Sequence, residues 1–339
     1  MHSQPSGEAE NFRQALRPLR RLYGNTLVEK FGPKALKGLR FEMNRMGWAR
    51  TYINRQIDRI KQVFKWGVAE ELLPPSIYHG LLAVAGLRKG EADTRESEPV
   101  KPVPIDYVNG ILAHVSRPAK SMIEIQLLTG MRPGEICMMR SCNIDTTGKL
   151  WLYTPTKHKT EHHGHTRQIY LGPKAQEIIR PFLKMDTKSY LFSPAEAERE
   201  RREQLHAARK TPMNQGNKPG SNRARQRDRA PGEHYDEASY RRAISRGCQK
   251  AFSMPADLAK APKDETPEHK KTRLASARKW RADHIWHPNQ LRHTAATDLR
   301  KTYGLEAAQV ILGHKTLSVT QIYAEKNVEA AQRIMAAVG

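Results

Sequence analysis

Apolar side chains recur at three- and four-residue spacing between positions 50 and 73, and this periodicity constrains the fold of the chain strongly. Residues at this spacing lie on one face of an α-helix, so the stretch predicts a helix with one buried face. Further helices are then needed to cover that face. The apolar series comprises Ile53, Ile57, Ile60, Phe64 and Val68.

Two earlier stretches, 12–22 and 33–46, also have helical character, so residues 1–88 predict a small all-helical domain. The polar face of the 50–73 helix carries Arg55 and Arg59. A basic face of this kind either contacts a phosphate backbone or is simply solvated. We take Arg55 and Arg59 as candidate DNA-binding residues.

A polar segment rich in proline, residues 89–104, is typical of a linker. Beyond it, the pattern predicts helices over 105–115, 121–128 and 134–140, and two short strands over 150–154 and 167–171, which form a hairpin. We therefore expect residues 105–339 to form a second, α+β catalytic domain. The whole chain should be mainly α with a small antiparallel β-sheet.

Two parts of the second domain, near 193–236 and 255–281, are dense in charged residues and poor in large apolar ones. Such a composition cannot supply much core, so we expect basic, flexible surface insertions there. A helix over 237–252 lies between them.

The chain is strongly basic, with 58 Lys and Arg against 35 Asp and Glu and a formal net charge of +23. This excess predicts a polyanionic partner, nucleic acid first. No apolar run approaches the ~18 residues of a membrane-spanning helix, and no signal peptide is evident, so we expect a cytoplasmic protein without a membrane partner. The 3 cysteines are too few for a disulfide framework or a four-cysteine metal site.

Residues suited to phosphodiester chemistry gather in short motifs. One is Thr129-Gly-Met-Arg132-Pro-Gly-Glu135, a second is Asn289-Gln-Leu-Arg292-His293-Thr294, and Leu312-Gly-His314 and then Tyr323 follow. Direct displacement at a phosphodiester requires a nucleophile, cations on the non-bridging oxygens and a proton donor for the leaving oxygen. Arginines suit the oxygens, because a planar guanidinium forms paired hydrogen bonds to phosphate and stays charged.

In their order and spacing these motifs resemble those of the tyrosine recombinases, or phage integrases. The resemblance covers about 104–339, and the helical domain is similar to the core-binding domain of that family. It implies that Tyr323 attacks the scissile phosphate to form a 3′-phosphotyrosyl bond, with Arg132, Arg292 and His314 on the phosphate oxygens. It also implies that no cofactor is needed, and it places Glu135 and His293 in support of the two arginines.

One position departs from the family pattern. Where the family has a histidine three residues before the second arginine, this chain has Asn289. Asn289 can form hydrogen bonds to a phosphate oxygen or a phenol, but it cannot accept a proton as imidazole does. His287 is the alternative for that role.

The resemblance also implies a lysine acid on the hairpin between the two arginine motifs. Lys159 matches the family pattern better than Lys157, which is the second candidate. Histidines crowd the same hairpin, but their spacing has no regular ligand geometry, so we expect phosphate contact there and no metal. They are His158, His162, His163 and His165.

The resemblance therefore implies a site-specific DNA recombinase, an integrase of a mobile element, that acts on double-stranded DNA. A homo-tetramer on paired DNA sites is expected because four strand exchanges require four nucleophiles, and accessory DNA-bending or directionality factors are possible partners. Two alternatives stay open. One is a catalytically inactive DNA-binding regulator, of which Asn289 would be a sign, and the other is relaxation of DNA in the manner of a type IB topoisomerase.

Overall fold

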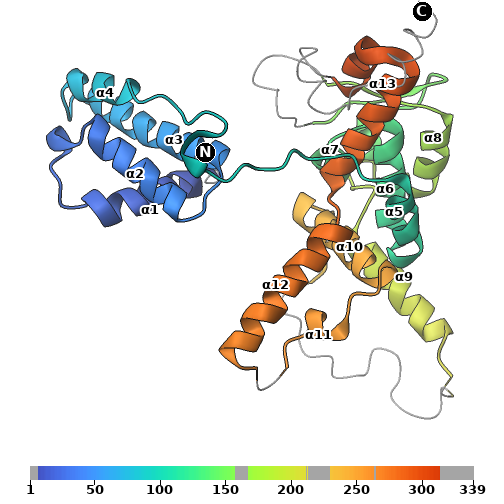
Figure 1. Ribbon diagram of the computed structural model, residues 1–339. Coiled ribbons are helices and arrows are strands. Elements are labelled where there is room, and N and C mark those ends of the chain that lie inside the picture. The colour runs from blue at the N-terminus through green and yellow to red at the C-terminus, as the bar shows by residue number, and fades with distance from the viewer. Residues whose placement is uncertain (1–6, 157–166, 211, 213–229, 263–264, 314–339) are drawn as a thin grey trace, which may run out of the picture. The chain divides into compact units, whose positions relative to one another are not determined.

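The chain forms two compact units, residues 1–99 and 100–339, in a computed structural model that describes residues 7–156, 167–210, 212, 230–262 and 265–313 (Figure 1). The boundary between the units falls inside the expected linker, 89–104. Each unit has its own cluster of buried apolar side chains. The two units are therefore described separately.

Unit 1 is all-helical, and its core forms around the predicted apolar stripe. Ile53 and Ile60 are fully buried, and Ile57 and Phe64 are nearly so. The helix that carries them packs against the other three helices of the unit, as the single apolar face requires. The four helices are α1 (Glu8–Tyr23), α2 (Pro33–Arg45), α3 (Arg50–Ala69) and α4 (Pro75–Leu82).

Unit 2 is built around helix α6, which packs against α7, α8, α10 and α13. Its buried side chains include Met122, Ile123 and Ile125. The buried amide of Gln126 accepts a hydrogen bond from the Tyr240 hydroxyl at 3.1 Å, and this bond fixes α6 to α10. The helices of unit 2 are α5 (Ile105–Ile111), α6 (Arg117–Thr129), α7 (Pro133–Cys137), α8 (Pro173–Ile179), α9 (Pro194–Ala207), α10 (Glu237–Ala251), α11 (Ala256–Ala259), α12 (Pro267–His284) and α13 (Pro288–Leu312).

A three-stranded antiparallel sheet lies in unit 2, in the order β1 (Ile144–Asp145), β2 (Trp151–Tyr153), β3 (Ile169–Leu171). Trp151 pairs with Leu171 and Tyr153 with Ile169. These four side chains are buried, since alternate residues of a strand face the same side. The predicted fold class, mainly α with a small antiparallel sheet, is confirmed. Strand β1 was not predicted, because two residues carry no periodicity.

The expectation of flexible loops near 193–236 and 255–281 was wrong where the structure has helices, which are α9 in the first range and α11 and α12 in the second. Ser193 accepts hydrogen bonds from the first turn of α9, and Thr266 does the same for α12. Each cap is followed directly by a proline at the first helical position, which is favourable there. The prediction weighed the lack of apolar residues and overlooked these start signals. Within the described ranges, no helix is both long and apolar enough for a membrane span.

Candidate active site

The turn between α6 and α7 positions Arg132 and Glu135. Gly130 ends α6 in the left-handed conformation, with φ +62°, and Arg132 is the N-cap residue of α7. The Glu135 carboxylate accepts the backbone N–H of Arg132 at 2.7 Å and its Nη1 at 2.8 Å. The Glu135 side chain is only 3% exposed, whereas that of Arg132 is 27% exposed. A buried carboxylate therefore orients a guanidinium that is partly open to solvent.

Arg292 joins the two arginine motifs, which are 160 positions apart in the sequence. It lies in the first part of α13, which is kinked by non-helical backbone at Gly304, and it has no exposed surface. Its Nη1 donates to the carbonyl of Gly130, and its Nη2 donates to the carbonyl of Leu312 at 2.8 Å. A buried guanidinium requires such acceptors, because an unpaired buried charge is costly. The side chain therefore fixes the Arg132 turn and the end of α13 to each other.

The other residues of the second motif lie in the first turns of α13. Asn289 is half-buried and precedes Arg292 by three residues, so the two share a face of the helix. His287 is the N-cap residue, and burial of its ring, with the nearby charge of Arg241, lowers its pKa and favours neutral imidazole. His293 is buried. The Thr294 hydroxyl donates to the Val103 carbonyl at 2.9 Å and anchors the start of unit 2.

Arg167, two residues before the start of β3, belongs to the same cluster and was not predicted as a site residue. Its side chain is 6% exposed, its Nη1 donates to the Ile311 carbonyl at 3.2 Å, and its Nε lies 3.7 Å from a carboxylate oxygen of Glu135. A signal for it exists in the sequence, because Arg167 shares the period-two face of buried Ile169 and Leu171. An arginine on a buried strand face requires an anionic or carbonyl partner.

The cluster has more positive than negative charge. Two guanidiniums, of Arg132 and Arg167, contact the single carboxylate of Glu135, and a third, of Arg292, binds the Gly130 and Leu312 carbonyls. Arg167 and Arg292 bind consecutive carbonyls at the C-terminus of α13, where unpaired carbonyls and the helix dipole favour cations. Burial lowers the pKa of Arg167. The Glu135 carboxylate raises this pKa, and the positive charge of Arg132 lowers it. Arginine nevertheless keeps its charge at any working pH, so the cluster suits an added anion.

The chain leaves α13 beside this cluster, at Gly313. That residue has φ +63°, and a Cβ atom there would lie 2.3 Å from Nη1 of Arg167. Several predicted site residues lie after Gly313 or on the hairpin between β2 and β3, and they are outside the described residues. They are Tyr323, His314, Lys157, Lys159, His158, His162, His163 and His165.

The candidate DNA-binding residues of unit 1 differ in their surroundings. Arg59 is 18% exposed and pairs with Glu8 of α1, its Nε lying 2.9 Å from a carboxylate oxygen. Its charge is therefore matched locally. Arg55 is exposed on α3 and has no ion pair with any residue that the structure describes. Of the two, Arg55 is the better placed to meet a phosphate.

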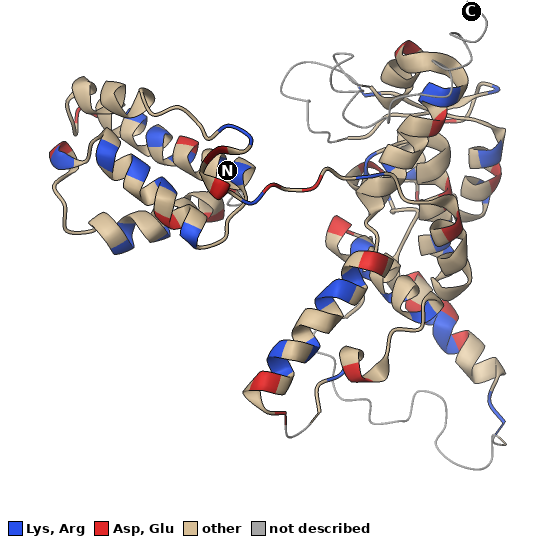
Figure 2. Ribbon diagram, in the orientation of Figure 1, with Lys and Arg blue, Asp and Glu red and all other residues tan. Residues whose placement is uncertain are grey.

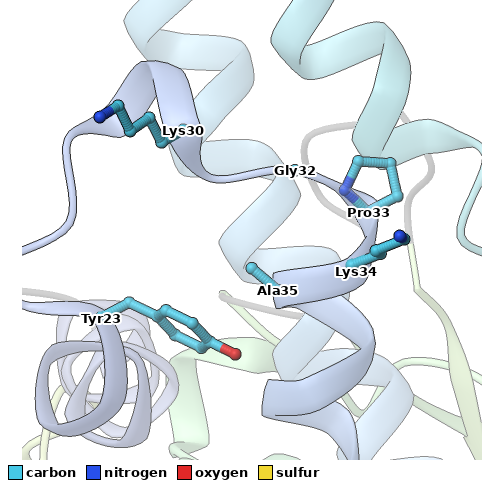
Figure 3. Close-up of a pocket in the computed structure, with 6 residues that line it drawn as sticks. All are labelled: Tyr23, Lys30, Gly32, Pro33, Lys34 and Ala35. Carbon is cyan, nitrogen blue, oxygen red and sulfur yellow. The ribbon is translucent and has the colours of Figure 1, made fainter.

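An open pocket in unit 1 lies beside the N-terminus of α2 (Figure 3). Tyr23, Lys30 and Lys34 are among the residues that line it. Figure 3 shows the amines of the two lysines pointing to opposite sides, so they do not converge on a common ligand. Among the described residues there is likewise no group of three His, Cys, Asp or Glu side chains close enough to hold a metal.

Comparison with known proteins gives one family and several structures. The sequence model described as "Phage integrase family" matches residues 105–226 and 258–330. The chain is similar in fold to the Tn1549 transposon integrase in complex with transposon right end DNA (TM-score 0.60, 14% identity, 99% of this chain and 94% of that one covered). It is also similar to a lambda integrase dimer bound to a COC' core site (TM-score 0.59, 14% identity, 95% and 72% covered) and to a lambda integrase tetramer bound to a Holliday junction (TM-score 0.55, 14% identity, 96% and 73% covered). No curated protein matches the sequence.

Proposed function

Because the chain belongs to the phage integrase family, we propose that it is a site-specific recombinase that cuts and rejoins double-stranded DNA. The observation that carries this proposal is the arginine cluster: Arg132 and Arg167 pair with Glu135, and Arg167 and Arg292 bind consecutive carbonyls at the end of α13. Preorganised positive charge of this kind stabilises the charge that develops on a phosphate during displacement.

We assign the chemical steps as follows. The Tyr323 hydroxyl attacks the scissile phosphorus, the bond to the 5′ oxygen breaks, and a 3′-phosphotyrosyl link and a free 5′ hydroxyl result. Lys159, or else Lys157, gives the proton to the leaving oxygen. Attack by the 5′ hydroxyl of a second strand reverses the step. The phosphotyrosyl bond retains the energy of the phosphodiester, so no nucleotide is required.

Arg132 and Arg292 bind the non-bridging oxygens, and His314 adds a hydrogen bond to one of them. Asn289, on the same face of α13 as Arg292, takes the place of the usual histidine as a hydrogen-bonding residue, with His287 as the alternative. Glu135 orients Arg132, and His293 supports Arg292. Because Arg292 has no exposed surface, phosphate contact requires a rearrangement of the chain around it.

We further propose a homo-tetramer on two DNA sites. Exchange of four strands requires four nucleophiles, and the solved lambda integrase tetramer is bound to a Holliday junction. DNA-bending or directionality factors would set the direction of the reaction. The protein would act in the cytoplasm, as part of a mobile element.

A nicked suicide substrate tests the proposal without knowledge of the target sequence. Duplexes with a nick near a randomised central sequence release a short strand on cleavage, so the covalent complex cannot reverse. We expect the full chain to form a covalent complex that resists denaturing electrophoresis and to select a defined sequence. Tyr323→Phe should form none. A chain that binds the duplexes but forms no complex would be an inactive regulator, and plasmid relaxation without recombinants would indicate a topoisomerase.

A further inference from the structure

Helix α12 has almost no buried face. It contains 18 residues, of which only Ala277 is buried. The side chains in line with Ala277, those of Arg273, Trp280 and His284, are half-buried. Figure 1 shows α12 and α9 extending away from the body of unit 2 in different directions. The packing of α12 therefore uses one narrow stripe and leaves the rest of the helix to solvent.

Four of the five exposed Lys and Arg side chains of α12 lie on one side of the helix, and Lys279 lies on the other. Lys270, Arg278 and Arg281 follow at intervals of eight and three residues, which places them on the same face, with Lys271 beside them. The acidic residues Glu268 and Asp283 lie near the two ends, as the red bands in Figure 2 show. This face therefore presents only positive charge over most of its length.

Helix α9 offers a contrast, because its arginines are paired with acids of the same helix. Arg201 and Arg202 both contact Glu198 at 3.0 Å, and Arg199 lies 4.0 Å from Glu203. A polar helix with little burial is usually stabilised by such pairs.

Helix α12 has no comparable pairs. Its Arg273 does bind Glu265, at 2.6 Å. Lys270, Arg278 and Arg281 have no ion pair with any residue in the described part of the chain. The charges of Arg278 and Arg281 are therefore unmatched within that part, and Lys270 interacts only at longer range with Glu265. Such an excess of unpaired cations is the arrangement expected of a surface that meets an external anion.

We propose that this face of α12 binds the phosphate backbone of duplex DNA, an inference that rests on the proposed function. The helix is ~27 Å long at ~1.5 Å per residue, which corresponds to about eight base pairs of duplex. It ends at His284, three residues before the N-cap of the helix that carries Arg292. A duplex bound to α12 is thus connected through a short segment to the candidate active site.

The salt dependence of DNA binding tests this inference with two matched variants of the full chain. The first is Lys270→Gln, Arg278→Gln and Arg281→Gln on α12, and the second is Arg199→Gln, Arg201→Gln and Arg202→Gln on α9. Each removes three positive charges from an exposed helix of the same unit. Binding to a 40-base-pair duplex of random sequence is followed by fluorescence anisotropy across a range of NaCl concentrations.

The slope of log affinity against log salt concentration is negative, and its magnitude is ~0.9 per phosphate contact. We expect this magnitude to decrease by about 2 to 3 for the α12 variant and to change little for the α9 variant. Lysine and arginine exchanged at the same three α12 positions should keep the original slope, and circular dichroism checks that each variant is folded. Equal slopes for the unmodified chain and the α12 variant, or equal losses in both Gln variants, would overturn the inference. If the unmodified chain did not bind DNA, the proposed function would fail with it.

A separate observation supports an inference about Arg167. Its buried guanidinium links two elements, because Nη1 donates to the Ile311 carbonyl near the end of α13 and Nε lies 3.7 Å from the Glu135 carboxylate of α7. We infer that Arg167 is a positioning residue that keeps the end of α13 in register with the pair formed by Glu135 and Arg132. It acts through these groups and not by contact with DNA.

Single-turnover cleavage of the suicide substrate at saturating DNA tests this role. Arg167→Gln should lower the rate by on the order of 10- to 100-fold with little change in DNA affinity, since small misplacements of reacting groups have effects of this size. Arg167→Lys, which keeps the charge, should recover part of the rate. Arg140→Gln is the control, because Arg140 is a half-buried arginine of unit 2 that binds Tyr190 instead. An unchanged rate in Arg167→Gln, or an equal loss in Arg140→Gln, would refute the inference, whereas a complete lack of cleavage by the unmodified chain would refute the proposed function as well.

Discussion

Arg292 has two roles that a mutation has to separate, because its guanidinium is both a candidate phosphate ligand and a structural link. It is the largest of the fully buried side chains in the described part of the chain. Its removal would leave the Gly130 and Leu312 carbonyls without this donor. Loss of cleavage alone would therefore not identify a contact to the phosphate.

We predict that Arg292→Ala retains DNA binding and loses cleavage by at least ~10²–10³-fold, the usual effect of removing one charge-stabilising group. The same variant should have a lower melting temperature, since two buried carbonyls lose a partner. Arg292→Lys keeps the charge but not the paired geometry, so its cleavage should also fall while its stability falls less. Cleavage at the unmodified rate in Arg292→Ala would remove the residue from the proposed mechanism.

Gly130 is the second residue where packing and backbone conformation meet at the site. A Cβ atom there would lie 2.4 Å from a methyl carbon of Leu312, and the residue has φ +62°. We predict that Gly130→Ala lowers the free energy of unfolding by about 2 to 4 kcal/mol, from left-handed strain and overpacking together. Urea denaturation measures this change.

Gly172→Ala is the control for that experiment. Gly172 has φ −73°, and an added Cβ would have no atom within 4 Å. Its stability should therefore stay close to that of the unmodified chain. Similar losses in the two variants would show that the contact with Leu312 is not the cause.

At the level of elements, apolar periodicity predicted most of the helices, because their buried faces carry the signal. The stripe of α3 and the strands β2 and β3 were found in this way, with boundaries a few residues from those observed. Helices α9 and α12 were missed because neither contributes more than a narrow contact to the core. For them the signal in the sequence is the capping residue, Ser193 or Thr266, with the proline that follows it.

The candidate site was predictable to a different extent. Arg132, Glu135 and Arg292 were identified from motifs, and the structure brings them into one cluster. Arg167 was missed because no motif contains it, and its partners, the Ile311 carbonyl and Glu135, are distant in the sequence. Only the alternation with Ile169 and Leu171 marks it as buried. The assignments to Tyr323 and His314 stay predictions.

The N-terminus of α10 provides a test at the element scale. Asp236 caps this helix: its carboxylate accepts the Ser239 backbone N–H at 2.6 Å, and its own N–H is bound by the Ser239 hydroxyl. Hydrogen bonding of the carboxylate to the Ser239 side chain, and next to the Ser239 backbone N–H, lowers the pKa of Asp236. We predict that Asp236→Ala lowers the free energy of unfolding by about 1 kcal/mol at pH 7.

The same cap should depend on pH in a defined direction. A carboxyl whose pKa is lowered by folding contributes stability above its unfolded pKa of about 3.9, and this contribution is lost as the pH falls through the folded value. The difference between the unmodified chain and Asp236→Ala should therefore shrink below about pH 4. Denaturant titrations of both proteins at pH 7 and pH 3 measure it, and a constant difference would exclude the charged cap as its source.

At the scale of the whole molecule, the separate cores predict that unit 1 and unit 2 each have their own free energy of unfolding. Unit 1 buries the α3 stripe, and unit 2 buries a cluster around α6 and the sheet. A fragment of residues 100–339 retains all the buried residues of its own cluster and the Thr294 hydrogen bonds to Val103. We predict that it unfolds in a single cooperative transition without residues 1–99.

The same fragment separates the contributions of the two units to DNA binding. It lacks Arg55 and the other basic residues of unit 1 but keeps α12 and the arginine cluster. Since each lost phosphate contact lowers the salt dependence by ~0.9, its slope with the 40-base-pair duplex should be shallower than that of the full chain. The α12 substitutions should reduce the magnitude of the slope equally in the fragment and in the full chain, because phosphate contacts made by separate units add independently. A fragment with the same slope as the full chain would show that unit 1 does not contact DNA. Phosphate binding would then have to come from unit 2, where the arginine cluster and α12 are the candidates.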